Sequence, residues 1–333
     1  MLCVVYRQVT FSNTYNSSSS VTGFILLGFT YTGETQKLLF IVLLTIYILT
    51  LLGNGSIICA VCWDERIHTP MYILLANFSF LEICYVTTTV PNMLANFFSE
   101  TKVISLSGCL LQFYLFSSFG AVECLFLAIM AFDRYLAICR PLHYHIIMTR
   151  HLRTRLVVTC WVIGFLWYPV PAIIISQLPF CGPKIIDHIL CDPSPILVLT
   201  CTPATMIEFT CSFLSSMILA VPFFFIIGTY TLVLKAVLRI PSGRGKRKAF
   251  STCGSHIVVV SLFYGSAMVI YMRPRSGNEA ETLKIVTLFY SMVTPFLNPV
   301  IYSLRNKEMK DALRKVLGHE NESLCKRYPL RSS

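Results

Sequence analysis

An acid and a base stand side by side at the end of an apolar run, in the segment MAFDRYLAICRPLHY (Met130–Tyr144). The pair is Asp133–Arg134, and an arginine stays ionised and offers several hydrogen-bond donors in a fixed geometry. Such a pair can form a contact and release it, which makes these residues a candidate switch. The alternative is purely structural, because charged residues also end membrane helices where the chain reaches water.

Two further acids, Glu82 and Glu123, lie in the middle of long apolar stretches. An ionisable group within the bilayer is costly and often marks an ion pathway, so an ion channel or a transporter is the alternative function. Against it, the two glutamates are isolated from other charges and the chain shows no inverted repeat. No nucleophile–base arrangement or metal-ligand spacing occurs, and the seven histidines are scattered. We therefore do not expect an enzyme.

The elements that must position these residues are membrane helices. The chain is 55% hydrophobic and only 13% charged, whereas a soluble domain carries roughly 25% charged residues. A bilayer core needs about 20 apolar residues per helix. Seven stretches meet this length, namely Leu38–Trp63, Met71–Phe98, Leu106–Phe132, Leu156–Leu178, Phe209–Leu234, Ala249–Met272 and Ile285–Leu304. We predict an all-α membrane protein with a seven-transmembrane helix bundle over residues 38–304.

Lysines and arginines are shared unequally between the two sides of this bundle. If the N-terminus is outside, twenty of the 27 basic residues lie in the inner connections and the inner tail, as the positive-inside rule expects. Residues 1–37 are then an extracellular segment with Asn16 as its glycosylation site, and residues 319–333 form a cytoplasmic tail. The net charge of +11 thus reports topology in a plasma-membrane protein, and no nucleic acid is expected as a partner.

A short amphipathic segment follows the seventh stretch. In LRNKEMKDALRKVLG (Leu304–Gly318), apolar side chains recur at helical spacing with cations on the opposite face. These apolar residues are Met309, Leu313, Val316 and Leu317. The pattern is typical of a helix that lies on a membrane surface. We expect this helix over residues 305–318, in contact with the lipid bilayer.

Four of the fourteen cysteines fall on the predicted outer side, at the head of the third stretch and in the connection after the fourth. They are Cys109, Cys181, Cys191 and Cys201. In an oxidising compartment four cysteines allow three pairings, which the sequence does not rank. The stretch His188–Asp192 (HILCD) can also be read as a metal site, although a disulfide-bonded sulfur is a poor ligand. We expect the long connection that holds three of these cysteines to be pinned and functional.

Seven segments, in order along the chain, carry a resemblance to a known family. They are FILLGFT (Phe24–Thr30), LLGN (Leu51–Asn54), PMYILLANFSFLEICY (Pro70–Tyr85), MAFDRYLAICRPLHY, the triple-cysteine connection, KAFSTCGSH (Lys248–His256) and PFLNPVIYSLRNK (Pro295–Lys307). In these segments the chain resembles the rhodopsin-like G-protein-coupled receptors and, closely, the tetrapod-type olfactory receptors. It departs from the family's usual pattern at Phe132, where tyrosine is usual, and at Glu82, where aspartate is usual.

This resemblance implies a switch at the inner ends of the helices. Arg134 is expected to be held by local contacts in the inactive state and released toward a G protein in the active state. In NPVIY, Pro299 breaks a helical hydrogen bond and allows a bend, and Asn298 can bridge the freed carbonyl groups. The expected switch residues are Asp133, Arg134, Tyr135, Tyr230, Asn298, Pro299 and Tyr302.

The resemblance also implies an odorant pocket in the outer half of the bundle. Two disulfides, Cys109–Cys191 and Cys181–Cys201, are expected to tie the long connection over it. Residues of the third and sixth stretches share helix faces by their spacing and match pocket positions of the family, although ordinary helix packing is the alternative. With one residue of the fifth stretch, the set is Phe116, Ser117, Gly120, Ala121, Ser215, Tyr264, Ala267, Met268 and Tyr271. The implied function is binding of small volatile odorants and activation of a heterotrimeric stimulatory olfactory-type G protein, with cyclic AMP as the signal.

The family directs Glu82 and Glu123 toward a shared polar centre with Asn54 and Asn298. Because unpaired charges are costly within the membrane, we expect these four residues to bind a sodium ion that stabilises the inactive bundle. Protonation of one of the two carboxyl groups is the alternative. No other cofactor is expected.

Overall fold

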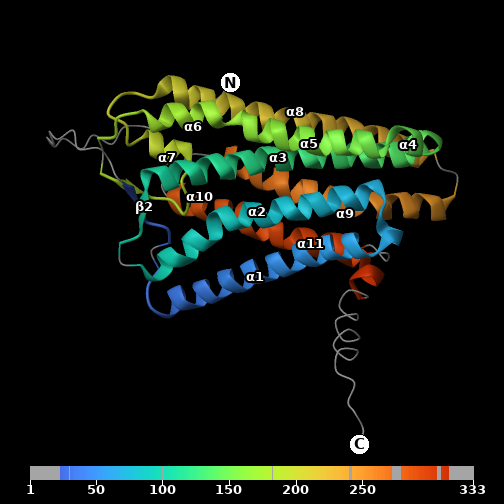
Figure 1. The fold of residues 1–333 in the computed structure, drawn as a ribbon, viewed down its shortest axis with the longest axis horizontal. Coiled ribbons are helices and arrows are strands. Elements are labelled where there is room, and N and C mark those ends of the chain that lie inside the picture. Colours follow the sequence, from blue (N-terminus) through green and yellow to red (C-terminus); the bar gives the residue numbers. More distant parts are fainter. Residues whose placement is uncertain are drawn as a thin grey trace, which may run out of the picture.

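The computed structural model describes residues 23–29, 31–99, 101–181, 183–239, 242–271, 279–305 and 309–314. Within them, long helices form a single bundle (Figure 1). Six helical segments are long and apolar enough to cross a bilayer, and helix α9 (Gly243–Tyr271) adds a shorter apolar part, Cys253–Met268. The predicted seven-helix membrane bundle is confirmed.

The other membrane spans follow the chain in order. They are α1 (Glu34–Trp63), α2 (Pro70–Phe98), α3 (Leu106–Cys139), α5 (Arg150–Trp167) with α6 (Pro169–Ser176), α8 (Thr205–Leu238), and α10 (Glu279–Leu288) with the π-helical turn Phe289–Val293 and α11 (Thr294–Arg305). Three short helices lie in the connections, namely η1 (Glu65–Ile67), α4 (Pro141–Ile147) and α7 (Pro193–Leu197). The fourth span is two helices because Pro169 and Pro171 have no N–H group to continue the ladder across Tyr168.

Helix α3 lies at the centre of the bundle and contacts α2, α5, α8 and α9. It approaches α5 closely because Gly164 has no side chain. A Cβ atom there would lie 2.2 Å from Val122 Cγ2 and 3.1 Å from the Ser118 carbonyl oxygen. The large apolar side chains that remain exposed, such as Leu52 on α1 and Phe224 on α8, lie on helices whose surroundings are lipid.

A three-stranded sheet, which the sequence did not predict, caps one end of the bundle. Strand β1 (Gly23–Leu26) is its middle strand, antiparallel to β2 (Val103–Ser105) and parallel to β3 (Ile185–Ile186). Phe24 and Leu26 are buried, and the Phe24 ring meets the Phe180 ring edge-on at 5.3 Å. The start of the FILLGFT segment therefore fastens the N-terminal chain to two other connections.

The opposite end of the bundle holds α4 (Figure 1). Residues 309–314, within the predicted amphipathic segment, are helical. Met309 and Ala312 are buried in the main core, whereas Lys310 and Arg314 are exposed. The apolar side of this short helix therefore packs against the bundle.

Candidate functional site

A cavity of about 170 Å³ lies between the helices, below the sheet end of the bundle. One wall comes from α3, through Phe116, Ser117, Gly120, Ala121 and Cys124. The other walls come from four further parts of the chain, through Tyr168, Ser215, Ile218, Leu219, Ala267, Leu283, Thr287 and Tyr290. An apolar cavity of roughly 150 Å³ can hold benzene, so this cavity has the size for a small organic molecule.

The cavity combines apolar walls with a few hydrogen-bonding groups. The Tyr168 hydroxyl lies 3.1 Å from Ser215 Oγ, and His188 Nε2 lies 3.5 Å from Thr287 Oγ1. Burial lowers the pKa of the His188 ring, which favours the neutral form, and a neutral imidazole has one donor and one acceptor nitrogen. Apolar enclosure with a few fixed polar groups is the usual composition of a small-molecule site.

The connection between α6 and α8 forms the roof of the cavity, to which it contributes His188, Leu190 and Asp192. A disulfide joins Cys191 of this connection to Cys109 of α3, with the Cα atoms 5.4 Å apart.

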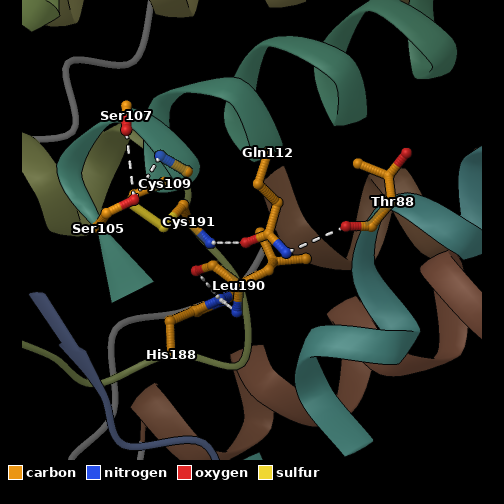
Figure 2. The surroundings of a disulfide bond; sticks show 9 residues. Thr88, Ser105, Ser107, Cys109, Gln112, His188, Leu190 and Cys191 are labelled. Carbon is orange, nitrogen blue, oxygen red and sulfur yellow. Dashed lines mark hydrogen bonds between the residues drawn. A yellow bond between two sulfur atoms is a disulfide. The ribbon is translucent and has the colours of Figure 1, made fainter. Parts of the chain in front are cut away.

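Figure 2 shows how Gln112 supports this disulfide: the Gln112 side chain accepts a hydrogen bond from the Cys191 N–H at 3.0 Å and donates one to the Thr88 carbonyl at 3.2 Å. A second disulfide joins Cys181 and Cys201. The structure thus forms the two pairs that the resemblance implied, and the Cys191 sulfur is engaged in one of them.

Six of the nine residues predicted to bind ligand line the cavity: Phe116, Ser117, Gly120, Ala121, Ser215 and Ala267. Met268 does not line the cavity. Its side chain is 50% exposed, because consecutive helical residues are rotated by about 100° around the axis. Tyr264 is buried against Phe223 and Phe263, with ring centroids 4.9 and 5.0 Å away, rather than in the cavity wall. The side chain of Tyr271 falls outside the described part of the chain.

At the other end of α3, the charged pair is held locally. Arg134 Nη2 lies 3.3 Å from Asp133 Oδ2, and Asp133 Oδ1 accepts a hydrogen bond of 2.8 Å from the hydroxyl of Tyr144 in α4. Asp133 is fully buried, whereas 14% of the Arg134 side chain is exposed. The buried acid therefore fixes the connection after α3, and the arginine stays near the surface.

The remaining predicted switch residues surround this pair on neighbouring helices. The Tyr230 hydroxyl on α8 lies 2.6 Å from His256 Nδ1 on α9, and Tyr230 and Tyr135 both pack against the small core cluster between these helices. Tyr302 is buried in the main core. Pro299 lies against α1, where a Cβ atom on Gly53 would be 3.1 Å from Pro299 Cγ.

A buried polar centre lies between the cavity and the charged pair. Asn298 donates a hydrogen bond to Glu82, and Glu123 is close enough to Glu82 for the two carboxyl groups to interact electrostatically. One oxygen on each of Glu82, Glu123 and Asn298 is buried without a hydrogen-bond partner. Asn54 points its amide at backbone instead, donating to the Thr50 and Pro295 carbonyls at 3.0 and 3.3 Å.

Comparisons with known proteins identify the family of the chain. A family model described as "Olfactory receptor" matches residues 43–320. Human olfactory receptor 11G2 is 63% identical over 314 residues, which are 94% of this chain and 91% of the relative. Human olfactory receptor 11H6 is 62% identical over 298 residues, 90% of each chain. The chain belongs to the olfactory receptor family. The olfactory receptor described here is thus a multi-pass membrane protein and not an enzyme.

Sequence reasoning missed several residues of this olfactory receptor's two sites. On the cavity side Tyr290 was missed, and His188 and Asp192 were considered only as part of a possible metal site although both line the cavity. No helix periodicity relates these three residues to α3. On the switch side they are Tyr144 and His256. Both of these lie inside segments that carried the resemblance, MAFDRYLAICRPLHY and KAFSTCGSH, so the signal for them was present in the sequence.

Proposed function

We propose that this receptor binds small volatile odorants in the cavity and, on binding, activates a heterotrimeric stimulatory olfactory-type G protein that raises cyclic AMP. One observation carries the proposal. Helix α3 supplies a wall of the cavity through Phe116 and Gly120, and the same helix carries the Asp133–Arg134 pair at its far end. A ligand that moves α3 against its neighbours therefore acts directly on the charged pair.

Two independent features support the proposed orientation in the plasma membrane. Disulfides persist in oxidising compartments, and both lie at the sheet end of the bundle. Most lysines and arginines belong to connections at the other end, as expected for the cytoplasmic side. The cavity then faces outward, the N-terminus is extracellular, and Arg134 faces the cytoplasm where a G protein can reach it.

The coupling step is the release of Arg134 from its local contact. Its partner is the neighbouring Asp133, and within the described part of the chain its Nε atom has no hydrogen-bond partner. Leaving this contact therefore breaks no contact with another described helix. His256 and Tyr302 are close enough to interact electrostatically with Arg134. Together with Tyr230 they offer polar groups to the guanidinium once the helices move apart.

We also propose a sodium ion at the polar centre, as a stabiliser of the inactive bundle. Buried charges are normally paired or bound to a metal, and three partnerless oxygens on Glu82, Glu123 and Asn298 supply the ligand type that a hard cation prefers. If bound there, the ion would offset one of the two carboxylate charges. Sodium titration of agonist potency should show an effect in the wild type that Glu123→Gln removes; identical potency across sodium concentrations in both proteins would exclude the ion.

An odorant panel applied to cells that report cyclic AMP tests the proposed function. We expect at least one small volatile to raise cyclic AMP in cells that express the receptor and not in cells without it. Membrane current recorded from the same cells separates the alternative. Ion flux that follows expression, without a G-protein response, would instead assign the polar centre to an ion pathway.

A further inference from the structure

Lys284, near the start of the last span, is a buried cation. Only 1% of its side chain is exposed, and its Nζ lies 2.6 Å from Asp187 Oδ1 and 2.8 Å from Glu281 Oε1. Glu281 is one turn back on the same helix, whereas Asp187 belongs to the roof and directly follows β3. A buried charge is costly unless it is paired. The contact with Asp187 therefore ties two elements that are remote in sequence.

A second contact joins the same two elements. His188, the next residue of the roof, lies 3.5 Å from Thr287, which is almost one turn further along α10. His188 and Thr287 both line the cavity, as does Leu283 next to Lys284. The ion pair thus stands at the rim of the cavity, where roof and wall meet.

We propose that Lys284 is a positioning residue that holds the roof against the last span and so controls passage between the cavity and the outside. We call Lys284, Asp187 and Glu281 the rim clamp. The Cys109–Cys191 disulfide and Gln112 fasten the roof to α3 on one side. The rim clamp fastens it to α10 on the other. When the disulfide and the rim clamp are both formed, the roof segment from Asp187 to Asp192 spans the cavity.

A cysteine in the cavity wall allows access to the cavity to be measured. Cys124 is a buried free thiol in the cavity wall. A charged, membrane-impermeant methanethiosulfonate reagent such as the trimethylammonium-ethyl derivative, applied to intact cells, reaches it only through the outer end. The Cys124 sulfur then forms a mixed disulfide with the reagent and releases methanesulfinate, so the labelling rate measures how often the roof opens. A Cys124→Ser background gives the signal to be subtracted.

Two variants remove the bond between roof and helix. Lys284→Met keeps the side-chain stem and removes the charge, and Asp187→Asn removes the other partner. We expect each to raise the labelling rate of Cys124 by about fivefold, because each removes the contact between Lys284 and Asp187 that joins α10 to the roof. The effect is modest because Asp187 and Glu281 are about half exposed and Lys284 keeps Glu281 as a partner when Asp187 is changed. The double variant should add little to either single change, because both remove the same contact. Lys284→Arg should keep the slow rate.

Two control variants distinguish loss of the rim clamp from a general effect of removing a charge. Glu281→Gln breaks only the contact within α10 and should change the rate far less than Asp187→Asn. Lys37→Met removes the cation of the Lys37–Glu34 pair, which has the same spacing and a 2.9 Å contact but is largely exposed; it should leave the rate unchanged.

The outcomes decide the proposal directly. Equal labelling rates in the wild type, Lys284→Met and Asp187→Asn would overturn it. If Lys284→Met fails to reach the cell surface, the labelling rate of Asp187→Asn decides the question. The Asp187 side chain is 52% exposed, so the protein should tolerate this change. The role in odorant passage rests on the proposed function, but labelling uses no odorant. The two proposals can therefore fail separately. Faster Cys124 labelling in the variants would support the rim clamp even if no odorant activates the receptor, and unchanged labelling would exclude the clamp even if an odorant does.

Discussion

Among the described residues, the ion-pair partner of Arg134 is its own neighbour in the chain, 3.3 Å away, rather than a residue of another helix. The contact can therefore open without unpacking the bundle. We predict that Arg134→Ala abolishes agonist-driven cyclic AMP while much of the protein still reaches the surface. Arg150→Ala, which removes the same charge from an exposed site on the same side, should keep the response. Full signalling by Arg134→Ala at matched surface expression would reduce the Asp133–Arg134 pair to a solvated helix end.

Gly120 leaves open space in the cavity that a larger residue would fill. A Cβ atom there would already lie 3.1 Å from the Tyr290 hydroxyl. Burying one apolar group contributes roughly 1.5–3 kcal/mol, so Gly120→Leu should weaken larger odorants by about tenfold or more by affinity arithmetic. Gly228→Leu is the control, because nothing lies within 4 Å of a Cβ atom at that site. Dose–response curves that match the wild type for several agonists would place the binding site elsewhere.

At the scale of elements, the contact between α3 and α5 depends on one missing side chain. A Cβ atom on Gly164 would lie 2.2 Å from Val122 Cγ2 and 3.1 Å from the Val122 backbone nitrogen. Overpacking of this kind costs about 1–3 kcal/mol, so Gly164→Val should lower surface expression and thermal stability. Gly164→Ala combined with Val122→Ala should recover part of the loss, whereas Gly228→Val should have little effect. Normal stability of Gly164→Val would mean that the two helices are not in close contact.

The membrane helices could be predicted because a span is a local property, a run of about 20 apolar residues. Even so, α3 continues to Cys139, beyond the predicted end at Phe132, because a helix extends into water once charged residues solvate it. The sheet could not be predicted. Strand β1 pairs with Ile104 and Ile185, and pairing between such remote segments leaves no periodic signal in so short a strand.

The wall and the roof of the cavity differed in how far the sequence could predict them. Helical spacing placed Phe116 and Gly120 on one face of α3, and both line the cavity. The roof residues His188 and Asp192 reach the cavity only because a disulfide and the rim clamp bring the connection down over it. Their positions depend on contacts across the fold, which the order of residues in the connection does not reveal.

For the whole molecule, the account requires the sheet end to face outward. We therefore predict that Asn16 carries a glycan and that Asn321, in a sequon on the cytoplasmic side, does not. Asn16→Gln should abolish the glycosidase-sensitive shift of the receptor on a gel, and Asn321→Gln should leave it intact. A shift that disappears only in Asn321→Gln would invert the topology and put Arg134 on the wrong side for a G protein.

The central claim is that a ligand in the outer cavity acts through the bundle on a G protein at Arg134. The most direct test reconstitutes the purified receptor in lipid nanodiscs with purified stimulatory olfactory-type G protein and measures agonist-dependent GTP binding. We predict that an odorant found in the cellular screen accelerates nucleotide exchange with the wild type, fails to do so with Arg134→Ala, and needs a higher concentration with Gly120→Leu. An odorant that binds the purified receptor without accelerating exchange, or one that still accelerates it with Arg134→Ala, would contradict the account.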